Sequence, residues 1–212
     1  MFDRALARLD KPAGDWLPRQ VILFSGHMVD APTRETPRFP ADKVEGAAQK
    51  IGAALDDLGA GPGDLALCQA AAGGDLLFLE ACQQRGLRCQ VLLPFPEAKF
   101  IDQSILPSTD GEGWRKRYFD AKTVLQQQEK GKGPSPLRIM PDELGGLPRG
   151  VDPFERCNLW LLYTTLSWGI DKARFVCLWN GGGSDGPGGT EHMYKEVKQR
   201  TGQVTWIDTR KL

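Results

Sequence analysis

The sequence has few histidines and no closely paired cysteines, and both shortages limit its chemistry. Only His27 and His192 are histidines among 212 residues. The five cysteines form no Cys-x-x-Cys pair and stand in apolar runs, where reduced cysteine behaves as a small hydrophobic residue. Two histidines without a thiol or carboxylate partner at ligand spacing do not indicate a zinc site, so we expect no bound metal. Reduced cysteines also favour a cytoplasmic location.

The chain also lacks an excess of charge and a long apolar run. Lys plus Arg and Asp plus Glu each number 27, so no net field steers the protein towards nucleic acid or anionic lipid. The most apolar stretch, residues 159–170, is too short to span a bilayer. Residues 1–19 lack the apolar core of a signal peptide. We therefore expect no membrane contact, and the balanced charge disfavours nucleic-acid binding.

Short apolar runs alternate with amphipathic segments along the chain. Strands are expected at 21–24, 65–68, 89–93, 137–140, 173–179 and 204–207. Helices are expected at 44–58, 76–85, 98–106, 114–125, 152–168 and 194–200, and a loop at 141–151. This alternation predicts an α/β protein with a single doubly wound, mostly parallel Rossmann-like sheet and helices on both faces. We expect residues 1–19 to be an N-terminal extension and residues 20–212 to be one domain.

Glycine is concentrated between residues 181 and 193, after the expected strand at 173–179. Six of the nine residues from Gly181 to Gly189 are glycines, and an amphipathic helix is expected to follow. Missing β-carbons allow a ligand to approach the backbone, and a helix start offers N–H groups and a positive dipole end. The composition is typical of a phosphate-binding loop, although a surface loop without a ligand has the same composition.

Two further turns of small residues follow the first and second expected strands. They are Ser25-Gly26-His27 and Ala72-Gly73-Gly74-Asp75. Because ligands bind beyond the carboxyl ends of parallel strands, we expect all three turns to form one site. The loop at 27–40 is long enough to act as a lid, and its Arg34 and Arg38 could bind a phosphate as forked donors. The sequence therefore predicts a site for a nucleotide or a nucleotide-derived ligand.

Several residues in these turns have alternative roles. Asp75 could cap a helix or bind a ribose, and we favour the cap. The histidines could contact the ligand or hold loops by hydrogen bonds. Asn158 is a polar residue in a nearly apolar helix. The full set of expected ligand contacts is Ser25, Gly26, His27, Arg34, Gly73, Gly74, Asp75, Asp185, Gly186, Gly188, Gly189, Thr190 and His192.

The motifs for common nucleotide enzymes are absent. The first turn has no G-x-G-x-x-G fingerprint, and the chain has no Walker A loop, so NAD-dependent hydride transfer and P-loop phosphoryl transfer are not leading interpretations.

Five motifs together resemble a Rossmann-like domain of the SLOG superfamily, which groups Smf/DprA with the Lonely Guy phosphoribohydrolases. These motifs lie at residues 24–28, 72–75, 91–95, 152–156 and 185–190. The resemblance implies a nucleotide-type ligand and a sensor role in bacterial signalling or defence. For such a sensor we expect either a homo-oligomer or an effector domain as partner.

The chain departs from the Lonely Guy motif PGGxGTxxE. Here Pro187 to Met193 lacks the x-Gly step, and no glutamate stands three residues after Thr190. Binding without turnover is therefore the preferred interpretation, with no cofactor besides the ligand. The alternative is an enzyme that cleaves an N-glycosidic bond, either a nucleotide phosphoribohydrolase or an NAD-type glycohydrolase. Its candidate catalytic groups are Asp75, Glu80 and Glu191. A Smf/DprA-like grip on single-stranded DNA is disfavoured by the balanced charge.

Overall fold

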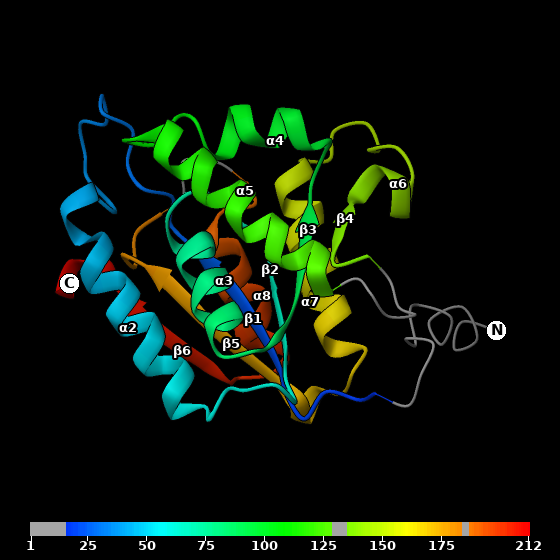
Figure 1. The fold of residues 1–212 in the computed structure, drawn as a ribbon. Helices are drawn as coiled ribbons and strands as arrows, with labels where there is room; N and C mark the ends of the chain where they lie inside the picture. The colour runs from blue at the N-terminus through cyan, green and yellow to red at the C-terminus, as the bar shows by residue number, and fades with distance from the viewer. Residues whose placement is uncertain (1–15, 129–134, 184–186) are drawn as a thin grey trace.

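The centre of the molecule is a parallel β-sheet. A computed structural model describes residues 16–128, 135–183 and 187–212 of the chain. Within these residues six strands pair in parallel in the order β4-β3-β2-β1-β5-β6. They are β1 (Val21–Gly26), β2 (Leu65–Cys68), β3 (Arg88–Leu93), β4 (Leu137–Ile139), β5 (Ala173–Trp179) and β6 (Val204–Asp208). This confirms the predicted single α/β sheet of the Rossmann-like class (Figure 1).

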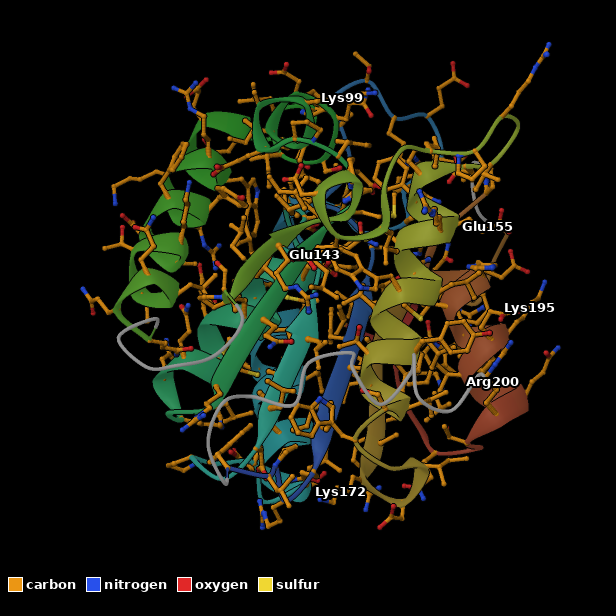
Figure 2. The ribbon with its side chains drawn as sticks, turned by 90° about the vertical axis from the view of Figure 1, so that its right-hand side faces the viewer. Lys99, Glu143, Glu155, Lys172, Lys195 and Arg200 are labelled. Carbon is orange, nitrogen blue, oxygen red and sulfur yellow. The ribbon has the colours of Figure 1, made fainter. Side chains whose placement is uncertain are left out.

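Helices cover both faces of the sheet. They are α2 (Val44–Asp57), α3 (Gly74–Gln84), α4 (Glu97–Ser104), α5 (Gly111–Gln128), α6 (Met140–Leu144), α7 (Pro153–Leu166) and α8 (Thr190–Arg200). Short 3-10 turns are η1 (Ala41–Lys43), η2 (Ile170–Lys172) and η3 (Thr209–Lys211). Figure 2 shows the sheet between α5 on one side and α7 with α8 on the other.

The alternating side chains of β1 explain this double cover. Ile22 and Phe24 pack into the cluster formed with α2, α3 and α5, whereas Val21 and Leu23 pack into the cluster formed with α7 and α8. All four side chains are at most 1 % exposed. A strand that is buried on both faces needs apolar residues at every position, which is why the sequence shows a continuous run.

The strand order changes direction beside β1. From β1 the chain continues to β2, β3 and β4 on one side, and then crosses back to β5 and β6 on the other side. The connections after β1 and β5 therefore lead away from each other, and a crevice forms at the carboxyl ends of these two strands.

Local sequence signals located most of the helices, with one correction. Asp152 caps α7 as predicted, because its Oδ1 accepts a hydrogen bond from Glu155 N at 2.9 Å. The prediction of a loop throughout 141–151 was wrong, because α6 occupies Met140–Leu144. The Arg156 guanidinium donates to the carbonyls of Leu144, Gly145 and Gly146, and so supports the end of this short helix.

The described part of the expected N-terminal extension lies at the amino ends of the strands. Trp16 packs edge-on against Trp168 with ring centroids 6.3 Å apart, and Arg19 Nη2 lies 2.7 Å from Asp64 Oδ2. Residues 1–15 lie outside the described residues. In the part of the chain that the structure describes, no helix has both the length and the apolarity needed to cross a bilayer.

Candidate ligand-binding site

A cavity of about 320 Å³ lies at the carboxyl edge of the sheet, where β1 and β5 separate. The three small-residue turns that follow β1, β2 and β5 all contribute to it, and α4 and α7 supply further walls. The described residues that line it are Ser25, Gly26, His27, Met28, Arg38, Gln69, Ala71, Asp75, Gln103, Ser104, Phe154, Asn158, Trp179, Pro187, Gly188, Gly189, Thr190 and Glu191.

Asp75 joins the ends of two strands beneath the cavity. Its Oδ1 accepts a hydrogen bond from Gly26 N at 3.1 Å, and its Oδ2 accepts one from Gln69 N at 3.2 Å. Burial raises the pKa of Asp75 to about 7, although the backbone N–H donors act in the opposite direction. The prediction that Asp75 is a helix N-cap was wrong. The cap of α3 is Gly73, and the Asp75 carboxylate turns back to the strand ends.

His27 is a buried, neutral imidazole that holds the start of the glycine-rich turn. Its Nε2 lies 3.1 Å from Asn180 Oδ1 and 3.3 Å from Asn180 N. Asn180 Oδ1 also accepts a hydrogen bond from Gly182 N at 3.0 Å. Burial lowers the pKa of His27 to about 4, and the positive charge of Arg38 adds to the decrease while the Asn180 contact opposes it. His27 therefore carries no charge at neutral pH.

Gly73 and Gly74 pack the start of α3 against the turn after β1. Gly73 has a φ of +101°, and a β-carbon there would lie 2.7 Å from Val29 N. Gly74 N donates to His27 O at 3.0 Å. Neither glycine lies among the described residues that line the cavity. Both were expected to contact the ligand, but the contacts that they make are with the neighbouring backbone.

Gly188 packs against the start of α7. Its φ is +77°, and a β-carbon would lie only 2.4 Å from Glu155 N. The carbonyl of Gly188 accepts a hydrogen bond from Asn158 Nδ2 at 2.6 Å, while Asn158 Oδ1 accepts one from Gln69 Nε2 at 2.9 Å. This chain of contacts connects the turns after β2 and β5 through α7.

Asn158 and Gln69 were not predicted as site residues. The available signal in the sequence was the polar Asn158 within the nearly apolar α7 helix. That signal shows that Asn158 needs a hydrogen-bond partner, but it does not identify the partner.

The start of α8 faces the cavity behind a glycine. Its N-cap is Gly189, which has no side chain, and Gly189, Thr190 and Glu191 all line the cavity. The Ser25 hydroxyl donates to Thr190 Oγ1 at 3.5 Å, a long contact between the turns after β1 and β5. N–H groups at a helix start are suited to binding an anion.

Three predicted residues lie elsewhere in the structure. Arg34 Nε lies 3.3 Å from Asp30 Oδ1, outside the cavity lining. Glu80 forms an ion pair with Arg117 on the surface between α3 and α5. His192 Nε2 lies 3.4 Å from Glu155 Oε1, and neither residue is among the described residues that line the cavity. Asp185 and Gly186, which were also predicted to contact the ligand, lie outside the described residues.

Glu191 lines the cavity from the first turn of α8. Its Oε1 lies 2.6 Å from Lys195 Nζ, one helical turn further along. Figure 2 shows Glu155 near the start of α7 and Lys195 on the adjacent α8. Across residues 16–128, 135–183 and 187–212, no group of three or more His, Cys, Asp or Glu side chains could hold a metal ion.

No protein-family model matches the chain, and no curated protein matches it by sequence.

Proposed function

We propose that this domain binds a nucleotide or a nucleotide-derived ligand in the cavity at the ends of β1 and β5. The observation that carries this proposal is the meeting of three strand-end turns with the start of α8, whose N-cap is Gly189. Backbone N–H groups and a positive dipole end are suited to a phosphate group. Crevices of this kind at the switch point of a parallel sheet are common ligand sites.

The other walls offer groups for the rest of a nucleotide. Gln69 and Asn158 present side-chain amides, while Met28 and Phe154 present apolar surface. Small-molecule sites combine a mainly apolar lining with a few fixed polar groups. The volume of about 320 Å³ is at the small end of the usual range of roughly 300–1,000 Å³, which favours a mononucleotide over a dinucleotide.

The motif resemblance to the SLOG superfamily supports the same ligand class. On that basis we propose a sensor role in bacterial signalling or defence. The partner would be either a second copy of the chain or an effector domain.

The proposal is tested by incubating the purified protein with AMP, cyclic AMP and NAD separately. We expect at least one of them to raise the thermal unfolding midpoint and to be recovered intact by chromatography, with AMP giving a larger shift than NAD. Adenosine serves as the uncharged control. If none of the nucleotides binds at millimolar concentration, the proposed function is wrong.

A second candidate is hydrolysis of an N-glycosidic bond, favoured by a specific observation at Asp75. This carboxyl group lines the cavity, and its pKa of about 7 suits a group that exchanges a proton at neutral pH. Water would add to the ribose C1′ as the bond to the base breaks, and the base would leave with a proton. Binding alone remains the preferred function, because both Asp75 oxygens already accept backbone hydrogen bonds.

Chromatography of the same incubations separates these two functions. Hydrolysis would release adenine from AMP or nicotinamide from NAD, and Asp75→Asn would abolish that release. Glu191→Gln tests the other carboxylate among the described residues that line the cavity. Intact nucleotide after prolonged incubation would exclude the hydrolytic function for that nucleotide.

A further inference from the structure

One glutamine of the turn after β2 lies in the cavity with a fixed orientation. Gln69 follows directly after β2, lines the cavity and is half-buried. Its Nε2 donates a hydrogen bond to Asn158 Oδ1 at 2.9 Å, and Asn158 Nδ2 donates to Gly188 O at 2.6 Å. These contacts form a chain of two side-chain amides that ends on a backbone carbonyl.

The carbonyl at the end of this chain determines how both amides are turned. A backbone carbonyl oxygen can only accept hydrogen bonds, so the Asn158 atom that faces Gly188 O must be the nitrogen. The Asn158 oxygen then faces Gln69, which must offer its own nitrogen. Turning either amide over would bring two acceptors together. The side-chain oxygen Oε1 of Gln69 is therefore the end that is left for a ligand.

The main chain at Gln69 is also fixed. Gln69 N donates to Asp75 Oδ2 at 3.2 Å. Ala70, the next residue, has a φ of +65°, in the left-handed region that residues with a β-carbon rarely adopt. Ala70 is 1 % exposed and Asn158 is 2 % exposed, so water does not replace the contacts that hold this turn. Gln69 thus presents its oxygen from a rigid support.

The oxygen of Gln69 is an acceptor that a ligand can use. Oε1 accepts no hydrogen bond from the residues that the structure describes. A cavity wall that offers an acceptor favours a ligand with a hydroxyl or an amino group at that place. In a nucleotide, both the ribose hydroxyls and the amino group of a base are such donors.

The position of Gln69 favours the ribose over the base. The phosphate is proposed to lie at the start of α8, whose N-cap Gly189 follows Gly188 in the chain. Along the chain of hydrogen bonds, only the Asn158 side chain lies between Gly188 and Gln69. The ribose of a nucleotide is bonded directly to the phosphate, whereas the base lies beyond the ribose. A side chain this close to the phosphate position therefore meets the sugar.

We propose that Gln69 recognises a ribose hydroxyl of the ligand through Oε1, and that Asn158 is the positioning residue that turns this oxygen towards the cavity. This inference deepens the proposed function and rests on it for the position of the phosphate. A site built to bind a hydroxyl rejects an analogue that lacks it, because the polar group of the site is then left unpaired. The ligand is thus a phosphorylated riboside rather than its deoxy counterpart.

The first experiment compares AMP with 2′-deoxy-AMP and 3′-deoxy-AMP by calorimetry. We expect at least one deoxy analogue to bind the wild type about three- to tenfold more weakly than AMP, as the loss of one neutral hydrogen bond predicts. The analogue that is rejected identifies the hydroxyl that Gln69 binds. Equal affinity for all three nucleotides overturns the assignment.

The second experiment asks whether this selection depends on Gln69. Gln69→Met has a similar length but no amide, so it should bind AMP and the rejected analogue equally. Gln83→Met is the matched control, because Gln83 Nε2 also donates at 2.9 Å, to Ala121 O, but lies outside the cavity lining. The control should keep the selection. If Gln69→Met keeps it too, or loses a preference for AMP over IMP instead, the ribose contact of Gln69 is wrong.

Two variants test the positioning role of Asn158. Asn158→Leu removes the acceptor that holds Gln69 Nε2, so the Gln69 amide can turn and the selection should fall. Asn158→Asp keeps an oxygen at that contact and should keep the selection, although its negative charge should weaken the binding of every phosphate. Loss of selection in both variants would show that Asn158 does not act through Gln69. Urea unfolding shows whether each variant is folded, and the Gln69→Met comparison is independent of both.

Ribose 5-phosphate separates this inference from the proposed function. If it binds in a way that depends on Gln69 while no nucleotide binds, the hydroxyl contact is retained and the nucleotide is rejected. If AMP binds without selection against either deoxy analogue, the proposed function is retained and the role of Gln69 is rejected. If neither the sugar phosphate nor any nucleotide binds, both are wrong.

Discussion

At the level of single residues, the buried Asp75 carboxylate connects β1 to β2 by accepting hydrogen bonds from Gly26 N and Gln69 N. Burial disfavours its charged form, so its pKa is about 7 in the folded protein, against about 3.9 in an unfolded chain. The folded state therefore binds more protons than the unfolded state between these two values. The stability that Asp75 contributes is full below pH 4 and is lost as the pH rises through 7.

This loss of stability with rising pH predicts how the Asp75→Asn variant behaves. Relative to this variant, which cannot titrate, the wild type should lose about 3 kcal/mol of unfolding free energy between pH 5 and pH 8. Urea denaturation at both pH values measures the change.

Asp64→Asn is the matched control for that measurement. Although burial acts to raise it, hydrogen bonds from Arg19, Gln20 and Gly61 lower the pKa of Asp64 below its usual value. Asp64 is therefore ionised in both states throughout pH 5 to 8, and the difference between this variant and the wild type should stay constant. An identical pH dependence for the wild type and Asp75→Asn would refute the buried titration.

At the level of elements, the glycine-rich turn is fixed by its contact with α7. A β-carbon at Gly188 would meet backbone atoms, Glu155 N at 2.4 Å and Phe154 C at 2.6 Å, so no side-chain rotation could relieve the overlap. Gly188 was predicted to allow the approach of a ligand. The structure shows that it allows the approach of a helix start, while its carbonyl binds Asn158.

Gly188→Ala should therefore destabilise the protein by several kcal/mol, because both the left-handed φ and the overlap oppose it. Gly202→Ala is the matched control, since its φ is also positive at +68° but no atom lies within 4 Å of the added carbon. The Gly202→Ala variant should lose only about 1 kcal/mol of unfolding free energy. Denaturant unfolding measures the loss of unfolding free energy in both variants. Equal losses would show that the close contact between Gly188 and α7 adds nothing to the destabilisation.

At the level of the whole molecule, β1 is a central strand that is protected on both faces. It lies between β2 and β5 in the sheet, and helices cover both of its faces. In contrast, β6 pairs with β5 alone within the described sheet, and Trp206 on β6 is 44 % exposed. Backbone hydrogen bonds of an edge strand open at lower free energy than those of a buried central strand.

Amide hydrogen exchange should follow this arrangement. We expect the slowest exchange at Val21–Phe24 and faster exchange at Val204–Trp206. Adding a nucleotide that binds should slow exchange at the turns after β1, β2 and β5, and should leave the centre of β6 unchanged. Mass spectrometry of peptides from both strands measures these rates, and slower exchange in β6 than in β1 would contradict the expectation.

The sequence by itself determined the sheet, its flanking helices and the common edge of the three turns. Continuous apolar runs, helical periodicity and caps such as Asp152 are local signals, and parallel strand order then places the turns together. It did not determine what each polar side chain contacts. Asp75 accepts from residues in two other segments, Gly188 meets a helix that begins 35 residues earlier, and Arg38 rather than Arg34 reaches the cavity. These roles depend on contacts between segments that are distant along the chain, so only the tertiary structure decided them.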